Sequence, residues 1–252
     1  MSESKNSTNT EHLILEAAEN EFLNKGFDSA KTTEIAKSAG VTHAMLHYYF
    51  RTKENLFNKV FEDRIELFSS SLFLNDRDND FEIKLDRILE SQMAGCNNYE
   101  KELRKKTINF LLIVSQMMSR HFDFIVENPL LPRFVVNELI SRPERMDNFS
   151  ERLKDIAGDL KSSFEKDLNF LISQGSINSV SSINLLLDIV SLNVFVFITF
   201  PIVKLFALND SKSAEEFFME RKKENISTIL HRLTNDKNLI AEILDVVEKR
   251  HQ

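Results

Sequence analysis

The sequence predicts an all-α protein that has a small N-terminal domain of three helices and a larger helical body. Helix breakers are scarce, with 5 glycines and 4 prolines among 252 residues. Apolar residues recur at helical spacing, as in Ile14, Ala18 and Phe22. Two short amphipathic segments, TTEIAKSA and THAMLHYYF, are separated by Gly40-Val41, which is typical of a helix-turn-helix.

The N-terminal elements can be assigned in order. Residues 1–10 are polar, and we expect a disordered tail there, with a first helix that begins near Thr10 and ends at Gly26. The second helix turns Ile35 inward, and Thr42 caps the third helix. We therefore expect a helix-turn-helix domain over residues 11–58, followed by a body over residues 59–252.

A fourth helix opens at Lys53, and no linker separates it from the body, so we expect a continuous helix to join the two parts. Ser213 and Glu216 have the spacing of a capping box, which places the start of another helix. The apolar patterns of the body predict helices over 81–93, 101–124, from Pro132 onward, 146–173, 183–208, 214–233 and 237–250.

The segment 183–208 is strongly apolar. Its uncharged window, Ile189 to Val203, has 15 residues, whereas a membrane span needs about 20. We therefore expect a buried helix and no membrane association. The N-terminus has no apolar stretch typical of a signal peptide, which indicates a cytoplasmic protein. Cys96 is the only cysteine, which excludes an internal disulfide and a CxxC metal site.

Residues 11–58 resemble the N-terminal DNA-binding domain of the TetR (tetracycline-repressor-like) family of bacterial transcription regulators. The resemblance is carried by ILEAAENEFLNKGF, EIAKSAGVT and LHYYFRTKENLF, in that order and without gaps. It implies an all-helical homodimer that binds double-stranded DNA and whose body binds a small molecule. Ala30, Lys31, His43, Met45 and His47 depart from the residues that are common at these positions in the family.

The third helix is expected to enter the major groove of DNA. Cations, hydroxyls and helix N-termini bind phosphates, and the resemblance implies that the Tyr48 hydroxyl binds one. Thr42 contributes to DNA binding or only caps the helix. His43 and His47 also have the spacing of a metal pair, but no third ligand lies nearby, so we expect no metal. The predicted DNA contacts are Lys31, Thr32, Thr33, Thr42, His43, Ala44, Met45, His47, Tyr48, Arg51 and Lys53.

The family resemblance implies that two long C-terminal helices pair with those of a second subunit, and the apolar character of residues 183–208 agrees with this. The predicted interface residues are Phe195, Phe197, Phe200, Ile202, Phe218, Ile226, Ile229 and Leu233. An effector pocket would be lined by apolar and adaptable side chains. The predicted lining, for which ordinary core packing is the alternative, is Met93, Cys96, Phe110, Met117, Met118, Phe122, Phe134 and Phe170.

These patterns favour a repressor that a small apolar or amphipathic effector releases from a palindromic operator. The alternative is a DNA-binding protein without an effector, whose body recruits another protein. The net charge of −7 means that any field that attracts DNA must be local. We expect neither an enzyme nor a cofactor, because the sequence has no glycine-rich phosphate loop, nucleophile elbow or metal cluster.

Overall fold

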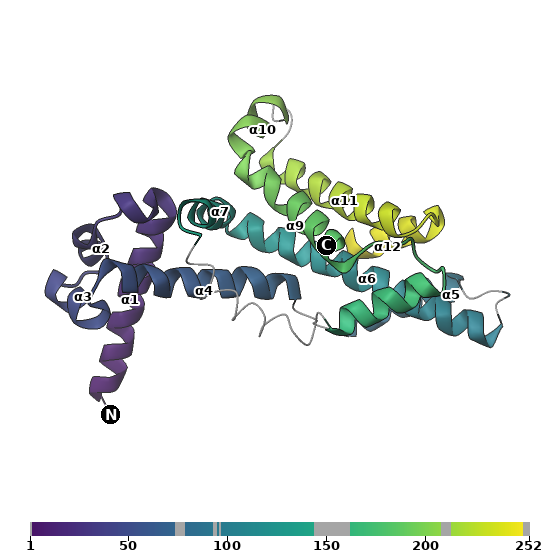
Figure 1. Cartoon of the computed structure of the whole chain (residues 1–252), viewed down its shortest axis with the longest axis horizontal. Helices are drawn as coiled ribbons and strands as arrows, with labels where there is room; N and C mark the ends of the chain where they lie inside the picture. The colour runs from purple at the N-terminus through teal and green to yellow at the C-terminus, as the bar shows by residue number, and fades with distance from the viewer. Residues whose placement is uncertain are drawn as a thin grey trace. The chain divides into compact units, whose positions relative to one another are not determined.

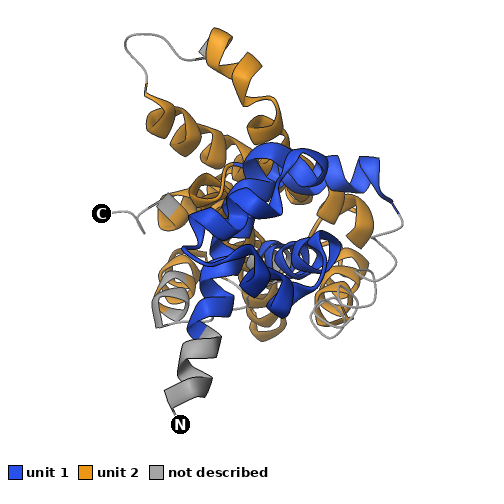
Figure 2. Cartoon of the chain, turned by 90° about the vertical axis from the view of Figure 1, so that its left-hand side faces the viewer, with its two compact units in different colours: residues 1–68, 130–150 blue, residues 69–129, 151–252 orange. Residues whose placement is uncertain are grey.

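The computed structural model describes residues 2–73, 79–92, 95, 97–143, 162–207 and 213–248, and every regular element within those ranges is a helix (Figure 1). The all-α prediction is therefore confirmed. The chain divides into two compact units (Figure 2). Unit 1 comprises residues 1–68 and 130–150, and unit 2 comprises residues 69–129 and 151–252. Unit 1 differs in two ways from the domain that was expected to end near residue 58. Its first segment extends to residue 68, and a later segment, residues 130–150, also belongs to it.

Unit 1 begins with three helices, α1 (Ser2–Ser29), α2 (Thr32–Ser38) and α3 (His43–Phe50). Helix α1 starts before the expected Thr10 and includes the segment for which a disordered tail was expected, since no glycine or proline interrupts residues 2–25. Gly26 breaks the helical path as predicted, with φ 72° and ψ 173°. A residue without a Cβ adopts this conformation without steric cost.

Unit 1 is completed by α7 (Leu131–Ser141) and by residues 53–68 of α4 (Lys53–Phe73), which begins at Lys53 as predicted. The ring of Phe57 on α4 lies 4.9 Å from that of Phe22 on α1 and 5.6 Å from that of Phe134 on α7, between centroids. Aromatic rings at these separations add attraction to the burial of their surface. This packing explains why α7 groups with the N-terminal helices although it is distant in sequence.

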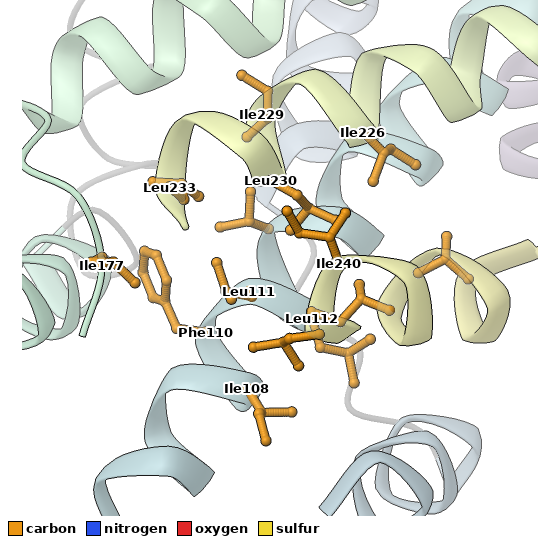
Figure 3. Packing of buried hydrophobic residues seen from close by; sticks show 14 of the residues in the cluster. Ile108, Phe110, Leu111, Leu112, Ile177, Ile226, Ile229, Leu230, Leu233 and Ile240 are labelled. Atoms are coloured by element: carbon orange, nitrogen blue, oxygen red, sulfur yellow. The ribbon is translucent and has the colours of Figure 1, made fainter. Parts of the chain in front are cut away.

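Unit 2 is built around the long helix α6, which packs against α5, α9, α11 and α12. A capping box between Asn97 and Glu100 starts α6. Leu111 and Leu112 of α6 belong to one apolar cluster with Leu230 of α11 and Ile240 of α12 (Figure 3). The helices are α5 (Asn79–Gln92), α6 (Asn98–Glu127), a segment over residues 162–173, α9 (Ser182–Ile198), α10 (Phe200–Ala207), α11 (Ala214–Leu233) and α12 (Lys237–Glu248).

The single helix expected over residues 183–208 is two helices, because α9 ends at Ile198 and α10 turns away from it by 74°. Pro201 lies just beyond the break, and proline cannot donate the backbone hydrogen bond that would continue the first helix. In the described residues no single helix is long and apolar enough to cross a membrane, and only the bent pair α9–α10 reaches that length and composition together. The predicted capping box of Ser213 and Glu216 is confirmed.

A buried polar network joins α6, α9 and α11 in the interior of unit 2. The Nδ2 atom of Asn193 donates to the carbonyl of Met118 at 2.9 Å and lies 3.3 Å from Nδ1 of His121. Asn225 donates from Nδ2 to the carbonyl of Leu192 at 2.9 Å and to Oδ1 of Asn193 at 3.1 Å. Both asparagines are 1 % exposed, so these bonds replace water that the side chains have lost. The helical patterns of the sequence gave no sign of this network.

His121 is fully buried within this network, and its burial lowers the pKa of the imidazole to about 3. The folded chain therefore keeps His121 neutral at a pH at which the unfolded chain protonates it. The stability that the neutral His121 contributes is fully present above the ordinary histidine pKa, and it decreases as the pH falls toward the pKa of His121 in the folded chain.

We expect the free energy of unfolding to fall between about pH 7 and pH 5, because unfolding then takes up one proton at His121. The contribution of this one group approaches about 1.4 kcal/mol per pH unit. Urea denaturation of the wild type and of His121→Gln across this range measures it, since glutamine does not titrate. Equal pH slopes for the two proteins would contradict the assignment.

Candidate nucleic-acid interface

The turn between α2 and α3 is closed by backbone hydrogen bonds. The amide of Val41 donates to the carbonyl of Ala36 at 3.0 Å, and the amide of Gly40 donates to that of Lys37 at 3.2 Å. Gly40 has φ 68°, which favours glycine. This is a Schellman ending of α2, and it reverses the chain at the predicted position.

Helix α3 buries one face and exposes the other. Leu46 and Phe50 are buried in the core of unit 1, as predicted. Tyr48 is 76 % exposed and Met45 is 40 % exposed. The hydroxyl of Thr42 accepts the amide of Met45 at 3.2 Å, so the expected cap of the helix is present. The exposed set on this helix and its cap is Thr42, His43, Ala44, Met45, His47 and Tyr48.

A chain of side-chain contacts crosses the start of α2 and the exposed face of α3. Oγ1 of Thr32 lies 3.0 Å from Nε2 of His43, and the rings of His43 and His47 meet edge to face at 4.5 Å between centroids. Nδ1 of His47 lies 2.8 Å from the carbonyl oxygen of Arg51. Lys31 and Thr33 are exposed beside this chain. The structure thus links Thr32 at the start of α2 with His43 and His47 on the exposed face of α3.

Lys53, at the start of α4, is held by the last residues of α1, which lie beyond the break at Gly26. Its Nζ donates to the carbonyl of Asp28 at 3.2 Å and lies 4.7 Å from the centroid of the Phe27 ring. The hydroxyl of Thr52 accepts the amide of Asn55 at 3.0 Å and so caps α4. A helix N-terminus that carries a cation is a favourable place for a phosphate.

Arg142, directly after α7, contacts the same segment. Its guanidinium carbon lies 4.2 Å from the centroid of the Phe27 ring, and its Nη2 lies 2.7 Å from a carboxylate oxygen of Asp28. Glu54 on α4 also lies near it, at 3.8 Å. The Phe27 ring therefore contacts two cations, one of which is the predicted phosphate ligand Lys53. Sequence reasoning missed Arg142, because 114 positions separate it from Asp28 and no local pattern marks it.

Several predicted interface residues of the dimer are buried within their own subunit. Ile226, Ile229 and Leu233 belong to the core cluster of unit 2 (Figure 3). The ring of Phe218 stacks on those of Phe197 and Phe200, at 4.9 Å and 5.2 Å between centroids. We therefore correct the prediction for Phe197, Ile226, Ile229 and Leu233 and remove them from the interface, since side chains already buried inside one chain offer no surface to a second. Phe200 and Phe218 are only half-buried and stay among the predicted interface residues. Phe195 and Ile202 remain exposed, at 65 % and 60 %.

The predicted lining of the effector pocket is not gathered in one place. Phe110 and Met118 belong to the core of unit 2, with Met117 packed against it, and Phe122 contacts Phe197 at 5.3 Å between ring centroids. Phe134 belongs to unit 1, where it packs on Phe57 and Phe61, so it is removed from the pocket.

The remaining predicted lining residues have other environments. Phe170 is 40 % exposed beneath the ammonium group of Lys106, which lies 4.9 Å from the ring centroid. Met93 and Cys96 lie outside the described residues. Within the ranges that the structure describes, no three His, Cys, Asp or Glu side chains gather as a metal site.

Comparison with known proteins agrees with the geometry of this surface. Residues 14–60 match the family described as bacterial regulatory proteins, tetR family. The chain is 39% identical over 66 residues to an uncharacterised helix-turn-helix-type transcriptional regulator, YdgC, of Bacillus subtilis (strain 168). That match covers 25% of this chain and only 34%, about a third, of the relative. The N-terminal domain of this chain therefore matches the tetR family over residues 14–60, and the resemblance is confirmed.

Solved structures resemble the fold over most of the chain at low sequence identity. A candidate transcriptional regulator from Streptomyces coelicolor gives a TM-score of 0.56 at 16% identity, covering 89% of this chain and 98% of the other. A candidate fatty acid metabolism regulator from Clostridium perfringens gives 0.54 at 19% identity, covering 88% and 98%. At these identities the likeness concerns the fold alone.

We expect Arg142→Ala to lower the stability of the chain by about 1–2 kcal/mol, because it removes a cation–aromatic contact and a partly buried ion pair. Chemical denaturation measures the loss. Arg133→Ala, at an exposed arginine at the other end of α7, is the matched control and should change stability by less than about 0.5 kcal/mol. Equal losses would show that the Phe27 contact contributes nothing.

The cap at Thr42 can be separated from a DNA contact. Thr42→Ala removes the hydroxyl that accepts the Met45 amide and should cost about 1 kcal/mol of stability, whereas Thr42→Ser retains it. Thermal unfolding compares the two variants. If serine is as destabilising as alanine, the hydroxyl is not the source of the effect.

Proposed function

We propose that this chain is a homodimeric DNA-binding transcription regulator, most simply a repressor that a small apolar or amphipathic effector releases from a palindromic operator. The proposal is carried by one observation. The face of α3 that the TetR family presents to DNA is exposed here, and hydroxyl, imidazole and cationic groups of unit 1 surround it.

The proposed docking on DNA is based on the N-termini of α3 and α4. Helix α3 enters the major groove, where His43, Ala44 and Met45 face base edges. Tyr48 and Lys53 bind phosphates on the flanking backbone. Lys31 and Thr33, which are exposed at the start of α2, are further phosphate ligands. Two such heads on a palindromic operator are about 34 Å apart.

The exposed apolar residues of unit 2 support a homodimer. Ile183, Leu187 and Phe195 on α9 are 58 %, 54 % and 65 % exposed, and their spacing in multiples of four places them along one helix face. Ile202 on α10 is 60 % exposed. An apolar face of this kind is typical of a protein interface. We therefore place the interface on this face of α9 and on α10.

The effector is proposed to bind within unit 2, where a polar network and an aromatic cluster lie one helical turn apart on α9, at Asn193 and Phe197. Among the residues that the structure describes, none offers a hydrogen bond to the buried Oδ1 of Asn225. A buried acceptor of this kind favours a ligand that has a donor group and an apolar remainder. An effector that opens this region would gain that bond.

Two continuous stretches of chain join unit 2 to unit 1, which carries the DNA-binding surface. Helix α4 carries Lys53 at its first residue and extends to Phe73 in unit 2. Helix α6 of unit 2 is followed after Asn128 by α7, whose end carries Arg142. A change within unit 2 therefore has two routes to the phosphate ligand. Because coupling is reciprocal, DNA must weaken the effector by the same factor.

We expect the wild type to bind the region upstream of its own gene and the double variant Tyr48→Phe with Lys53→Ala to lose that binding. Two phosphate contacts at each head are removed, so the affinity should fall at least about tenfold at moderate salt. A mobility-shift assay at two salt concentrations measures the affinity and its salt dependence.

The control for that experiment is thermal unfolding of the double variant, because Lys53 also contacts Phe27 and Asp28. A folded variant that binds DNA as tightly as the wild type would exclude the proposed docking.

Thermal shifts with apolar compounds test the effector separately, since a ligand that binds the folded chain raises its melting temperature. A chain that binds DNA but no such compound would favour the alternative, a body that recruits another protein.

A further inference from the structure

The end of α3 has a backbone geometry that few residues adopt. Arg51 has φ 62° and ψ −53°, and the amide of Thr52 donates to the carbonyl of Phe50 at 2.6 Å. These values describe a γ-turn with Arg51 at its centre, a conformation that side chains other than glycine disfavour. A disfavoured conformation that the surrounding structure maintains is a reason to look for a role.

The γ-turn directs the carbonyl of Arg51 back toward α3. That oxygen lies 2.8 Å from Nδ1 of His47, and the amide of Arg51 donates to the carbonyl of His47 at 3.0 Å. The two residues are therefore joined by two hydrogen bonds. The ring of His43 packs edge to face against the imidazole of His47. The His47 ring is therefore held both by this contact and by its hydrogen bond to the Arg51 carbonyl.

This contact fixes which nitrogen of His47 carries the proton. A carbonyl oxygen only accepts, so Nδ1 of His47 must be the donor. In a neutral imidazole the other nitrogen, Nε2, is then an acceptor. Nε2 has no hydrogen-bond partner among the residues that the structure describes, and the side chain is exposed on the face that is proposed to meet DNA.

We propose that His47 reads the operator as a hydrogen-bond acceptor and that the γ-turn at Arg51 sets this role. The inference rests on the proposed function, because it needs α3 in the major groove. In that groove adenine offers its N6 amino group and cytosine its N4 amino group, whereas guanine and thymine offer acceptors at the corresponding place. His47 therefore selects adenine or cytosine on the strand that it contacts, at one position in each half-site.

His43 does not share this role. Its Nε2 is 3.0 Å from the hydroxyl of Thr32, which can act as donor or acceptor, so the structure leaves its tautomer open. Tyr48 is assigned to a phosphate, and a phosphate contact carries no base information. The two neighbours on α3 thus provide matched comparisons for His47.

The first test concerns the free chain. Long-range ¹H–¹⁵N spectra of the imidazole nitrogens, recorded at about pH 8, where histidines are as a rule neutral, identify the protonated nitrogen. We expect Nδ1 of His47 to carry the proton in the wild type and in Arg51→Gly, since glycine accepts the positive φ. A proton on Nε2 in the wild type would overturn the inference, whatever the chain does with DNA.

The second test concerns base preference. Selection from randomised duplexes with the full wild-type chain defines the operator, and an adenine that it contacts is then replaced by a purine without the 6-amino group. We expect this replacement to lower the affinity of the wild type about fivefold per half-site, the usual effect of one hydrogen bond. The affinity of His47→Ala should be the same for the original and the replaced operator. Tyr48→Phe should bind more weakly to all duplexes but retain the fivefold difference.

The outcomes separate this inference from the function on which it rests. If the wild type binds no duplex, the proposed function fails and the base-reading role fails with it. If it binds a specific operator, but His47→Ala keeps the same preference for the amino group as the wild type, the role of His47 alone is disproved. Arg51→Gly should keep the preference for the amino group, while its affinity for DNA should depend less on salt. That result supports the view that the backbone turn at position 51, and not the charge of the arginine, sets the base preference.

Discussion

The packing of aromatic rings around Phe57 is the interaction on which the rest of unit 1 depends. The ring lies 4.9 Å from Phe22, 5.0 Å from Phe27 and 5.6 Å from Phe134, between centroids, and it thereby joins both parts of α1, on either side of Gly26, to α4 and α7. Each ring buries a large apolar area, and the edge-to-face geometry adds to that burial. This cluster therefore packs α4 against both α1 and α7.

The polar surface is supported by this cluster. Phe27 presents one part of its ring to Phe57 and another to the cations Lys53 and Arg142. The proposed phosphate ligand is thus positioned by an apolar core on one side and by the end of α7 on the other. This arrangement makes the position of a DNA-binding group depend on a helix that directly follows α6 of unit 2.

Unit 2 combines a continuous apolar core with a small number of buried polar side chains. Asn193, Asn225 and His121 must satisfy their hydrogen-bonding groups in a place that water does not reach. A network of this kind restricts how α6, α9 and α11 can pack, because a shift of one helix would break several bonds at once. It also provides polar groups inside unit 2 with which the proposed effector would form hydrogen bonds.

The sequence by itself determined the helical class, the helix-turn-helix with its Gly40 turn and Thr42 cap, the start of α4 at Lys53 and the capping box at Ser213. These features follow from short-range chemistry, in which a side chain acts on its own backbone or on a residue a few positions away. The inward face of α3 followed in the same way from helical periodicity.

The tertiary structure decided the rest. It assigned Phe134 to unit 1 and Ile226, Ile229 and Leu233 to the core of unit 2, although apolar periodicity also allowed a pocket or an interface. It also brought Arg142 to Phe27 and the Arg51 carbonyl to His47. The physical reason is that an apolar stripe states only that a face must be covered, whereas the three-dimensional packing decides which partner covers it.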